Sequence, residues 1–392
     1  MPFGYLWAVA LTATGTVFAL APVRWPRPVA HLSYFLGLIV NEIAFFAGCW
    51  LVLTTALAFG QKDIDTLGGW AIVGLAAVVM AGLAVVARRG LRDGASVERA
   101  MTEGLGPDWG EAISPDLRPR SRRRLPPARI LFWPFLAYRF DVRRVTNLRY
   151  GDAGRRNLLN VYRHRSRPVN APVLIHMHGG GYHRGRKGSQ SRPLLYRLAS
   201  QGWVCVSANY RLRPGAEHPD HLIDLKKVIA WVRENGHEYG ADPAVLFVAG
   251  SSAGAHMAAL AALTQNDPVF QPGFEDADTS VTAAVCLNAY YGQYYGQSPE
   301  SSPLSHITPD APPFFIAHGG RDTLVPVEDA RQFAQALRRT SANPVVYAEL
   351  RDAHHAFDLF HSPRYDAVVN AVEDFAAWVR SREPASRLFP HT

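Results

Sequence analysis

The stretch VLFVAGSSAGAHMAALAAL, residues 245–263, decides the fold. It opens with large apolar residues typical of a buried strand and ends in an alanine-rich run typical of a helix. Between them lies Gly250-Ser251-Ser252-Ala253-Gly254, a G-x-S-x-G pattern. The middle serine of this pattern occupies a strained turn, and the glycines let strand and helix approach closely. We therefore expect Ser252 to be an exposed nucleophile; the alternatives are a role for Ser251 or a turn without chemistry.

Further short apolar runs predict a sheet around this strand. They are separated by helical stretches such as residues 222–232, where leucine, isoleucine and valine recur at helical spacing. The predicted strands lie at residues 173–175, 204–206, 283–287, 314–316 and 345–347. Strands that alternate with helices favour a mostly parallel sheet covered on both faces. In such sheets the active site lies at the carboxyl ends of the strands.

A glycine cluster, His178-Gly179-Gly180-Gly181-Tyr182, follows the strand at 173–175. Backbone amides without obstructing side chains can converge on a developing oxyanion. We expect the donors to be the amides of Gly179, Gly180 and Ala253. A phosphate-binding loop is excluded because Arg186 stands where that motif requires lysine.

A hydroxyl nucleophile needs a base, and the base needs an orienting group. Asp322 follows the strand at 314–316, and His354 and His355 follow the last predicted strand. The chain order Ser, Asp, His is the one expected of this sheet architecture. Spacing alone does not choose between the two histidines, and Asp352 or Asp358 could also orient either ring.

The chemistry so far requires neither metal nor organic cofactor. A metal site on His176, His178 and His183 is the alternative, but no carboxylate accompanies these histidines nearby. The three cysteines are far apart and lack CxxC spacing, which excludes a thiolate zinc site and a disulfide framework.

The N-terminal quarter of the chain is apolar. Residues 1–23 and 66–87 carry no charged side chain, and residues 28–60 carry only Glu42. Each run is long enough to cross a hydrocarbon core, which takes roughly 20 helical residues. We therefore predict three transmembrane helices. Arginines after the first and third helices place everything beyond residue 87 in the cytoplasm by the positive-inside rule.

This pattern predicts a transmembrane segment over 1–90, a basic and aromatic linker with a possible cap over 91–145, and a catalytic domain over 146–385. The linker holds an arginine cluster between Arg118 and Arg129, followed by an aromatic run at 130–136. Such a segment suits an anionic membrane surface, or it is a solvated linker. Residues 101–170 carry fifteen Lys/Arg and six Asp/Glu, so this one stretch holds the whole basic excess of a chain with net charge +8, which argues against a nucleic-acid enzyme.

Together these motifs resemble those of the hormone-sensitive-lipase-like carboxylesterases of the α/β-hydrolase superfamily, notably membrane-attached actinobacterial esterases. The resemblance covers roughly residues 150–380. It rests on residues 178–181, 209–214, 250–254, 322–326 and 355–357. It implies an α/β-hydrolase fold, here preceded by the bundle of three transmembrane helices.

The resemblance also implies roles for residues. Ser252, His355 and Asp322 would form a catalytic triad, with His355 chosen because the family's histidine precedes a small residue and Phe. Ser251 departs from the family, which often has Asp before the nucleophile. The substrate pocket would include Tyr182, Tyr290 and Tyr291, unless these tyrosines only pack beneath a cap.

The function expected from these features is that of a membrane-anchored serine carboxylesterase or lipase without cofactors. It would act on a small-molecule or lipid ester at the plasma membrane, as a multi-pass protein with a cytoplasmic catalytic domain, and without nucleic acid. The alternatives are a prenylcysteine-type methylesterase or an acyltransferase with the same triad, or a non-catalytic membrane-tethered binding module.

Overall fold

A computed structural model of the chain describes residues 3–119 and 127–382. Within them, one sheet of eight strands has the order β1-β2-β4-β3-β5-β6-β7-β8. Strands β3 to β8 are parallel, whereas β1 and β2 pair antiparallel at one edge. The strands are β1 (Val142–Arg149), β2 (Leu158–His164), β3 (Ala171–Met177), β4 (Val204–Ala208), β5 (Ala241–Ser251), β6 (Ala283–Leu287), β7 (Phe314–Gly319) and β8 (Val345–Leu350).

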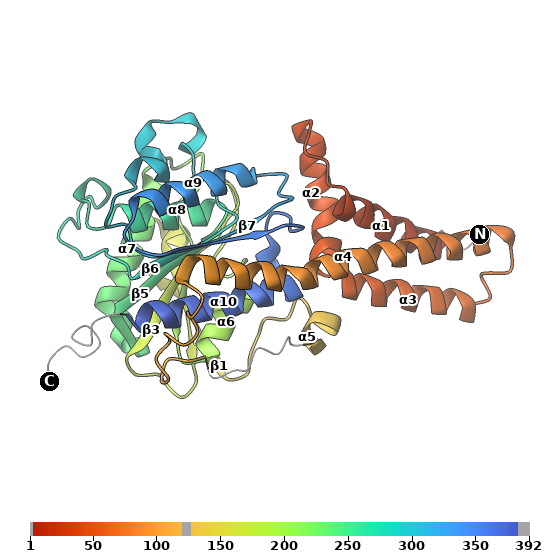
Figure 1. Cartoon of the computed structure of the whole chain (residues 1–392), viewed down its shortest axis with the longest axis horizontal. Helices are drawn as coiled ribbons and strands as arrows, with labels where there is room; N and C mark the ends of the chain where they lie inside the picture. The colour runs from red at the N-terminus through yellow and green to blue at the C-terminus, as the bar shows by residue number, and fades with distance from the viewer. Residues whose placement is uncertain (1–2, 120–126, 383–392) are drawn as a thin grey trace.

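The structure confirms a mostly parallel sheet with helices on both faces (Figure 1). One apolar core packs α7 (Asp220–Asn235), α8 (Ala253–Leu263) and α9 (Val327–Thr340) against the sheet. A second core on the opposite face contains α6 (Arg192–Ser200) and α10 (Pro363–Arg380). Short 3-10 helices complete the connections: η1 (Gly154–Asn157), η2 (Gly236–Tyr239), η3 (Pro268–Phe270), η4 (Tyr294–Gly296), η5 (Pro299–Ser301), η6 (Pro303–His306) and η7 (Phe357–Leu359).

The antiparallel strands β1 and β2 were not predicted. Most of the side chains of β1 are exposed or half-buried, and several are arginines. An edge strand with charged side chains lacks the continuous apolar run that marks a central parallel strand.

The apolar N-terminal region folds as helices α1 (Phe3–Leu20), α2 (Arg27–Glu42), α3 (Ala44–Gly60) and α4 (Leu67–Leu105). The predicted single helix over 28–60 is wrong, because the chain bends by 83° between α2 and α3. Ile43, at the bend, has non-helical torsions of φ −120° and ψ 42°. Two helices, α1 and α4, are long and apolar enough to cross a membrane, or three if the bent pair counts as one span.

Helix α4 joins the two parts of the molecule. It is 39 residues long, which corresponds to about 58 Å of helix, and it runs unbroken through residue 90, where we had placed a domain boundary. Its second half packs against β8 and α10, with Val97 and Met101 in the apolar core. The expected linker at 91–145 is therefore partly structural core, which also includes Trp109 and Ile113. Residues 120–126, with four arginines of the predicted cluster, lie outside the described residues.

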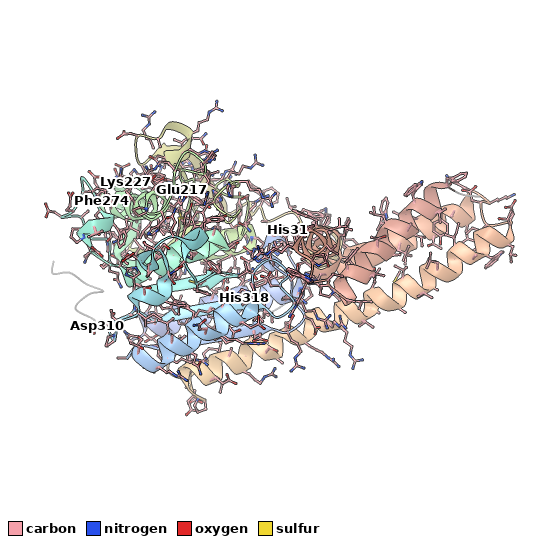
Figure 2. The ribbon with its side chains drawn as sticks, turned by 90° about the horizontal axis from the view of Figure 1, so that it is seen from above. His31, Glu217, Lys227, Phe274, Asp310 and His318 are labelled. Carbon is pink, nitrogen blue, oxygen red and sulfur yellow. The ribbon has the colours of Figure 1, made fainter. Side chains whose placement is uncertain are left out.

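A buried ion cluster fastens the N-terminal helices to the catalytic unit. Arg364 of α10 donates to Glu42, the last residue of α2, and to Asp93 of α4, the latter at 2.5 Å. All three side chains are 3% exposed or less. Figure 2 labels His31 in the first half of α2, the helix that lies between the rest of the helical bundle and the sheet. Glu42, the one charged residue of the apolar run 28–60, is thus a structural ion-pair partner.

Candidate active site

Ser252 lies at the turn between β5 and α8, as predicted. Its torsions, φ 53° and ψ −120°, are unusual for a residue with a side chain, so the turn is strained. The two glycines of the motif explain how the turn closes. A Cβ on Gly250 would lie 2.2 Å from the backbone of Gly254, and a Cβ on Gly254 would lie 2.1 Å from the carbonyl oxygen of Met177. Only glycine permits this approach of strand and helix.

The three residues of the expected triad lie in hydrogen-bond contact. The Ser252 hydroxyl lies 3.0 Å from Nε2 of His355, and Nδ1 of His355 lies 2.5 Å from Oδ2 of Asp322. The other oxygen of Asp322 accepts the amides of Leu324 and Val325, both at 2.8 Å. This arrangement holds the imidazole with its acceptor nitrogen toward the serine.

Electrostatics in the triad favour a charged pair of Asp322 and His355. Burial alone would raise the pKa of Asp322, but the charges and hydrogen bonds of His355 and His318 hold it well below its usual range. Burial likewise opposes a charged imidazole, yet the Asp322 carboxylate outweighs it and raises the pKa of His355. The imidazolium that forms when His355 takes a proton is therefore stabilised.

The other candidates for base and acid have different partners. His354 is fully buried, and burial lowers its pKa to about 4. Asp352 forms an ion pair with Arg321 at 2.9 Å. Asp358 accepts the hydroxyls of two serines, as described next. The geometry thus selects His355 and Asp322 from the alternatives that the sequence left open.

A buried network beneath the nucleophile was not foreseen. Ser251, the residue before Ser252, donates to Asp358 at 2.5 Å, and Ser191 donates to the same oxygen at 2.6 Å. Nε2 of His176 lies 3.1 Å from the Ser251 hydroxyl. Asp358, in η7, thus places a buried carboxylate against Ser251. In the sequence, the one hint of this network is that Ser251 stands where the family often has Asp. No spacing rule identifies Asp358 as its partner.

The predicted oxyanion donors are partly corrected. The amide N–H of Gly179 donates to Oε1 of Gln190 at 2.5 Å, so this N–H is not available to a substrate oxygen. Gly179 instead lies against the nucleophile, where a Cβ would come within 2.8 Å of the Ser252 Cβ. The amide of Ala253, in the first turn of α8, has no intrahelical acceptor. The amides of Gly180 and Gly181 have no backbone acceptor within residues 3–119 and 127–382. The glycine loop therefore offers Gly180 and Gly181 rather than Gly179.

A cavity of about 640 Å³ opens beside Ser252. Tyr182 and Tyr290 line it, as predicted, and Tyr182 is fixed by a 2.7 Å hydrogen bond to His256. The prediction for Tyr291 is wrong. Its side chain is fully buried and stacks on Phe333 with ring centroids 4.1 Å apart, because the loop after β6 turns this side chain into the core. Further lining residues are Arg27, Tyr294, Tyr295, Leu324 and Asp329.

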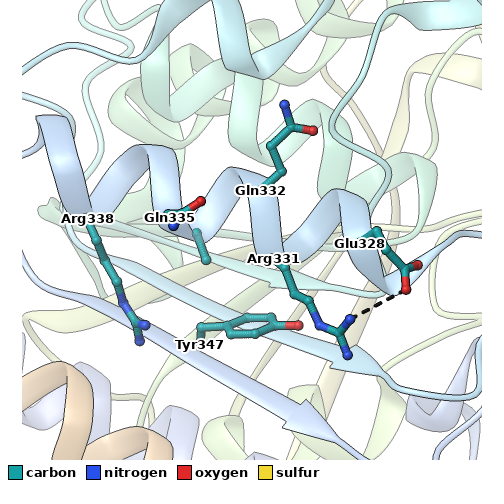
Figure 3. A pocket seen from close by; sticks show the side chains of 7 residues that line it. Glu328, Arg331, Gln332, Gln335, Arg338 and Tyr347 are labelled. Carbon is teal, nitrogen blue, oxygen red and sulfur yellow. Dashed lines mark hydrogen bonds and ion pairs between the residues drawn. The ribbon is translucent and has the colours of Figure 1, made fainter.

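Another hollow, of about 490 Å³, lies on the outer side of α9 and β8 (Figure 3). Arg331, Arg338 and Tyr347 line it, and Arg331 forms ion pairs with Glu328 and Glu349. No triad residue reaches this hollow. We therefore place the reaction in the cavity beside Ser252.

Known proteins show the family of this chain. A family model described as BD-FAE matches residues 159–296 and 275–337. The chain is 37% identical to the probable carboxylic ester hydrolase LipM of Mycobacterium tuberculosis, over 97% of this chain and 94% of that protein. It is 42% identical to the esterase LipQ of the same organism, over 62% of this chain and 64% of that protein.

Among solved structures, the butyrate-bound esterase Est2 of Thermogutta terrifontis superposes with a TM-score of 0.53 at 25% identity. The match covers 58% of this chain and 92% of that one. Relatives and structural neighbours agree on ester hydrolysis as the activity. The chain belongs to the hormone-sensitive-lipase-like carboxylesterases of the α/β-hydrolase superfamily.

Proposed function

We propose that the protein is a membrane-anchored serine carboxylesterase in which Ser252, His355 and Asp322 are the catalytic triad. One observation carries the proposal: the serine hydroxyl lies 3.0 Å from a histidine whose other nitrogen lies 2.5 Å from a buried carboxylate, at the wall of a cavity. A hydrogen-bonded nucleophile, base and orienting acid is the arrangement that acyl transfer requires.

In the proposed reaction, Ser252 attacks the carbonyl carbon of the ester while His355 accepts the hydroxyl proton. The amides of Gly180, Gly181 and Ala253 donate to the oxyanion of the tetrahedral intermediate. His355 then protonates the leaving alcohol as the intermediate collapses to an acyl-enzyme. A water molecule, deprotonated by His355, repeats the sequence and releases the acid. Asp322 keeps its negative charge throughout and holds the imidazole in place.

The anchoring part of the proposal rests on α1 and α4, which are apolar and long enough to cross a bilayer. Three arginines, Arg88, Arg89 and Arg92, follow the apolar part of α4, where the chain passes to the catalytic unit. By the positive-inside rule, this side faces the cytoplasm, and the catalytic unit lies there as well.

A fluorophosphonate probe tests the nucleophile, because it reacts with activated serines. In detergent-solubilised full-length protein, the wild type should be labelled and Ser252→Ala should not. Ser251→Ala is the matched control, since it removes the adjacent hydroxyl and should keep the labelling. The assignment of the nucleophile would be refuted if Ser252→Ala were still labelled, or if labelling disappeared in Ser251→Ala but not in Ser252→Ala.

A further inference from the structure

Helix α2 has an unusual position between two apolar helices. It begins seven residues after α1 ends, and α3 follows it after a bend of 83°. In Figure 1 it stands across the bundle of α1, α3 and α4, at the junction with the sheet. A helix that lies across membrane-crossing helices lies along the plane of the membrane.

The inner face of α2 packs on the active site. Tyr34 and Leu38 form an apolar cluster with Ala356, the residue after the triad histidine. The ring of Tyr34 meets the ring of His355 edge-on, with centroids 6.0 Å apart. The Thr323 hydroxyl donates to the carbonyl of Ala30 at 3.2 Å. The histidine itself and the residues that directly follow the histidine and the acid thus contact α2.

Helix α2 also contributes to the cavity itself. Arg27, its first residue, lines the cavity together with Ser252 and Tyr290. The N-terminal segment is therefore part of the wall of the active site and not only an anchor.

The outer face of α2 is mostly apolar and exposed; it also carries His31, and Arg184 of the catalytic unit lies over the ring of Phe35, 5.7 Å from its centroid. Val29, Leu32, Phe35 and Ile39 recur at spacings of three and four residues, which places them on one stripe. Their side chains are 36% to 52% exposed. Helices in water carry polar residues on such a face, whereas an apolar outer stripe is typical of helices that lie in a membrane interface.

Two features identify a lipid bilayer as the partner of this stripe. Only six residues separate α1 from α2, and the seven Cα–Cα steps from Leu20 to Arg27 can span at most about 25 Å, so α2 cannot leave the vicinity of the membrane that α1 would cross. Trp25, within this connection, is 77% exposed, and tryptophan is enriched at membrane interfaces.

An exposed aromatic segment of the catalytic unit lies beside the same bundle. Trp133 and Phe135 follow α5 (Pro127–Phe132) and are more than half exposed. Phe135 packs between Phe46 of α3 and Phe360, at centroid distances of 5.8 and 5.3 Å. Phe360 in turn packs against the cluster that contains Tyr34. Apolar surface therefore extends from the bundle to the rim of the active site.

We propose that α2 is an interfacial helix whose outer stripe lies in the bilayer surface and whose inner face walls the active site, so that the substrate is an amphiphilic ester drawn from the lipid leaflet. This inference rests on the proposed function, because it names the substrate class of the same site.

The position of α2 can be measured with an environment-sensitive NBD label. The label is attached at Leu32→Cys in a Cys49→Ser background, since Cys205 and Cys286 are buried. The full-length protein is reconstituted in phosphatidylcholine and phosphatidylglycerol vesicles. We expect quenching by doxyl lipids and protection from iodide at position 32. A label at Val269→Cys, in η3 of the catalytic unit and 72% exposed, is the control and should be quenched by iodide but not by doxyl lipids. Iodide quenching at position 32 equal to that at 269 would overturn the proposal.

The substrate class is tested by a ratio of activities. Leu32→Gln/Ile39→Gln should lower the turnover of p-nitrophenyl myristate in vesicles at least fivefold relative to p-nitrophenyl acetate in water. Val269→Gln should leave this ratio unchanged. An unchanged ratio in the α2 variant would refute entry from the leaflet. Failure of the proposed function would show differently, as hydrolysis of p-nitrophenyl acetate by Ser252→Ala.

Discussion

Replacing Arg364 by methionine should destabilise the whole protein, because two buried carboxylates would lose their counter-ion. Arg364 is 1% exposed, Glu42 is 0% exposed and Asp93 is 3% exposed. Glu42 retains only the neutral donors Asn41 at 2.9 Å and Ser362 at 3.2 Å. Methionine approximates the aliphatic stem of arginine but supplies neither charge nor hydrogen bonds.

The size of the effect follows from burial. Removing one partner of a buried ion pair costs about 3–5 kcal/mol, because the remaining charge is left without compensation. For a unit of this size, 1 kcal/mol changes the melting temperature by roughly 2–4 °C, so we expect a decrease of about 6–20 °C. The loss should affect the bundle and the catalytic unit together, since the cluster joins α2, α4 and α10.

The assay is thermal unfolding of the detergent-solubilised protein, followed in parallel by residual esterase activity. Arg331→Met is the matched control. Arg331 pairs with Glu349 at 2.6 Å, but these side chains are 50% and 30% exposed, so the variant should lose no more than about 1 kcal/mol. A triple variant, Arg364→Met with Glu42→Gln and Asp93→Asn, removes the uncompensated charges and should recover most of the stability.

Equal melting temperatures for Arg364→Met and Arg331→Met would refute the reasoning. Failure of the triple variant to recover would also contradict it, because the loss would then arise from packing of the arginine stem and not from the carboxylates.

Two further predictions concern the active site. The acid limb of the pH profile of kcat/KM should lie above pH 6.5, the ordinary pKa of histidine, because Asp322 raises the pKa of His355 and the base must be neutral to act. Asp322→Asn removes the charge that opposes burial, so the pKa of His355 should fall and the acid limb should move to lower pH. The rate should fall on the order of 10⁴-fold. An acid limb at the wild-type pH would count against the assignment of Asp322. Gly254→Ala should prevent correct folding, since its Cβ would lie 2.1 Å from a backbone oxygen. Gly110→Ala is the control, because its Cβ would meet nothing within 4 Å, and it should fold normally. Thermal melts followed by circular dichroism compare the two variants with the wild type.

The nucleophile turn was readable from the sequence because its determinants are local. Apolar residues before Gly250, small residues after Ser252 and the absence of Cβ atoms at two positions are all properties of one continuous stretch. The central parallel strands were readable for the same reason, since each is buried on both faces and is therefore uniformly apolar. The site residues Asp322 and His355 followed from their position after such strands together with the family resemblance.

The errors arose where a side chain depends on distant parts of the chain. The Gly179 amide donates to Gln190, eleven residues further along the same β3–α6 connection, and Tyr291 packs on Phe333 of α9. Neither contact has a signature in the local pattern. The bend at Ile43 lies inside a run that is apolar enough for one long helix, so hydropathy alone could not reveal it.

The sequence by itself therefore determined the fold class, the turn that holds Ser252 and the chain order of the three residues that we propose as a triad, because these depend on periodicity and on local backbone sterics. Tertiary structure alone decided which amides remain free beside Ser252 and that the Ser251 hydroxyl donates to Asp358. It also decided that α2 forms part of the wall of the site. These features depend on contacts between residues tens to hundreds of positions apart, such as Glu42 with Arg364, and such contacts exist only once the chain has folded.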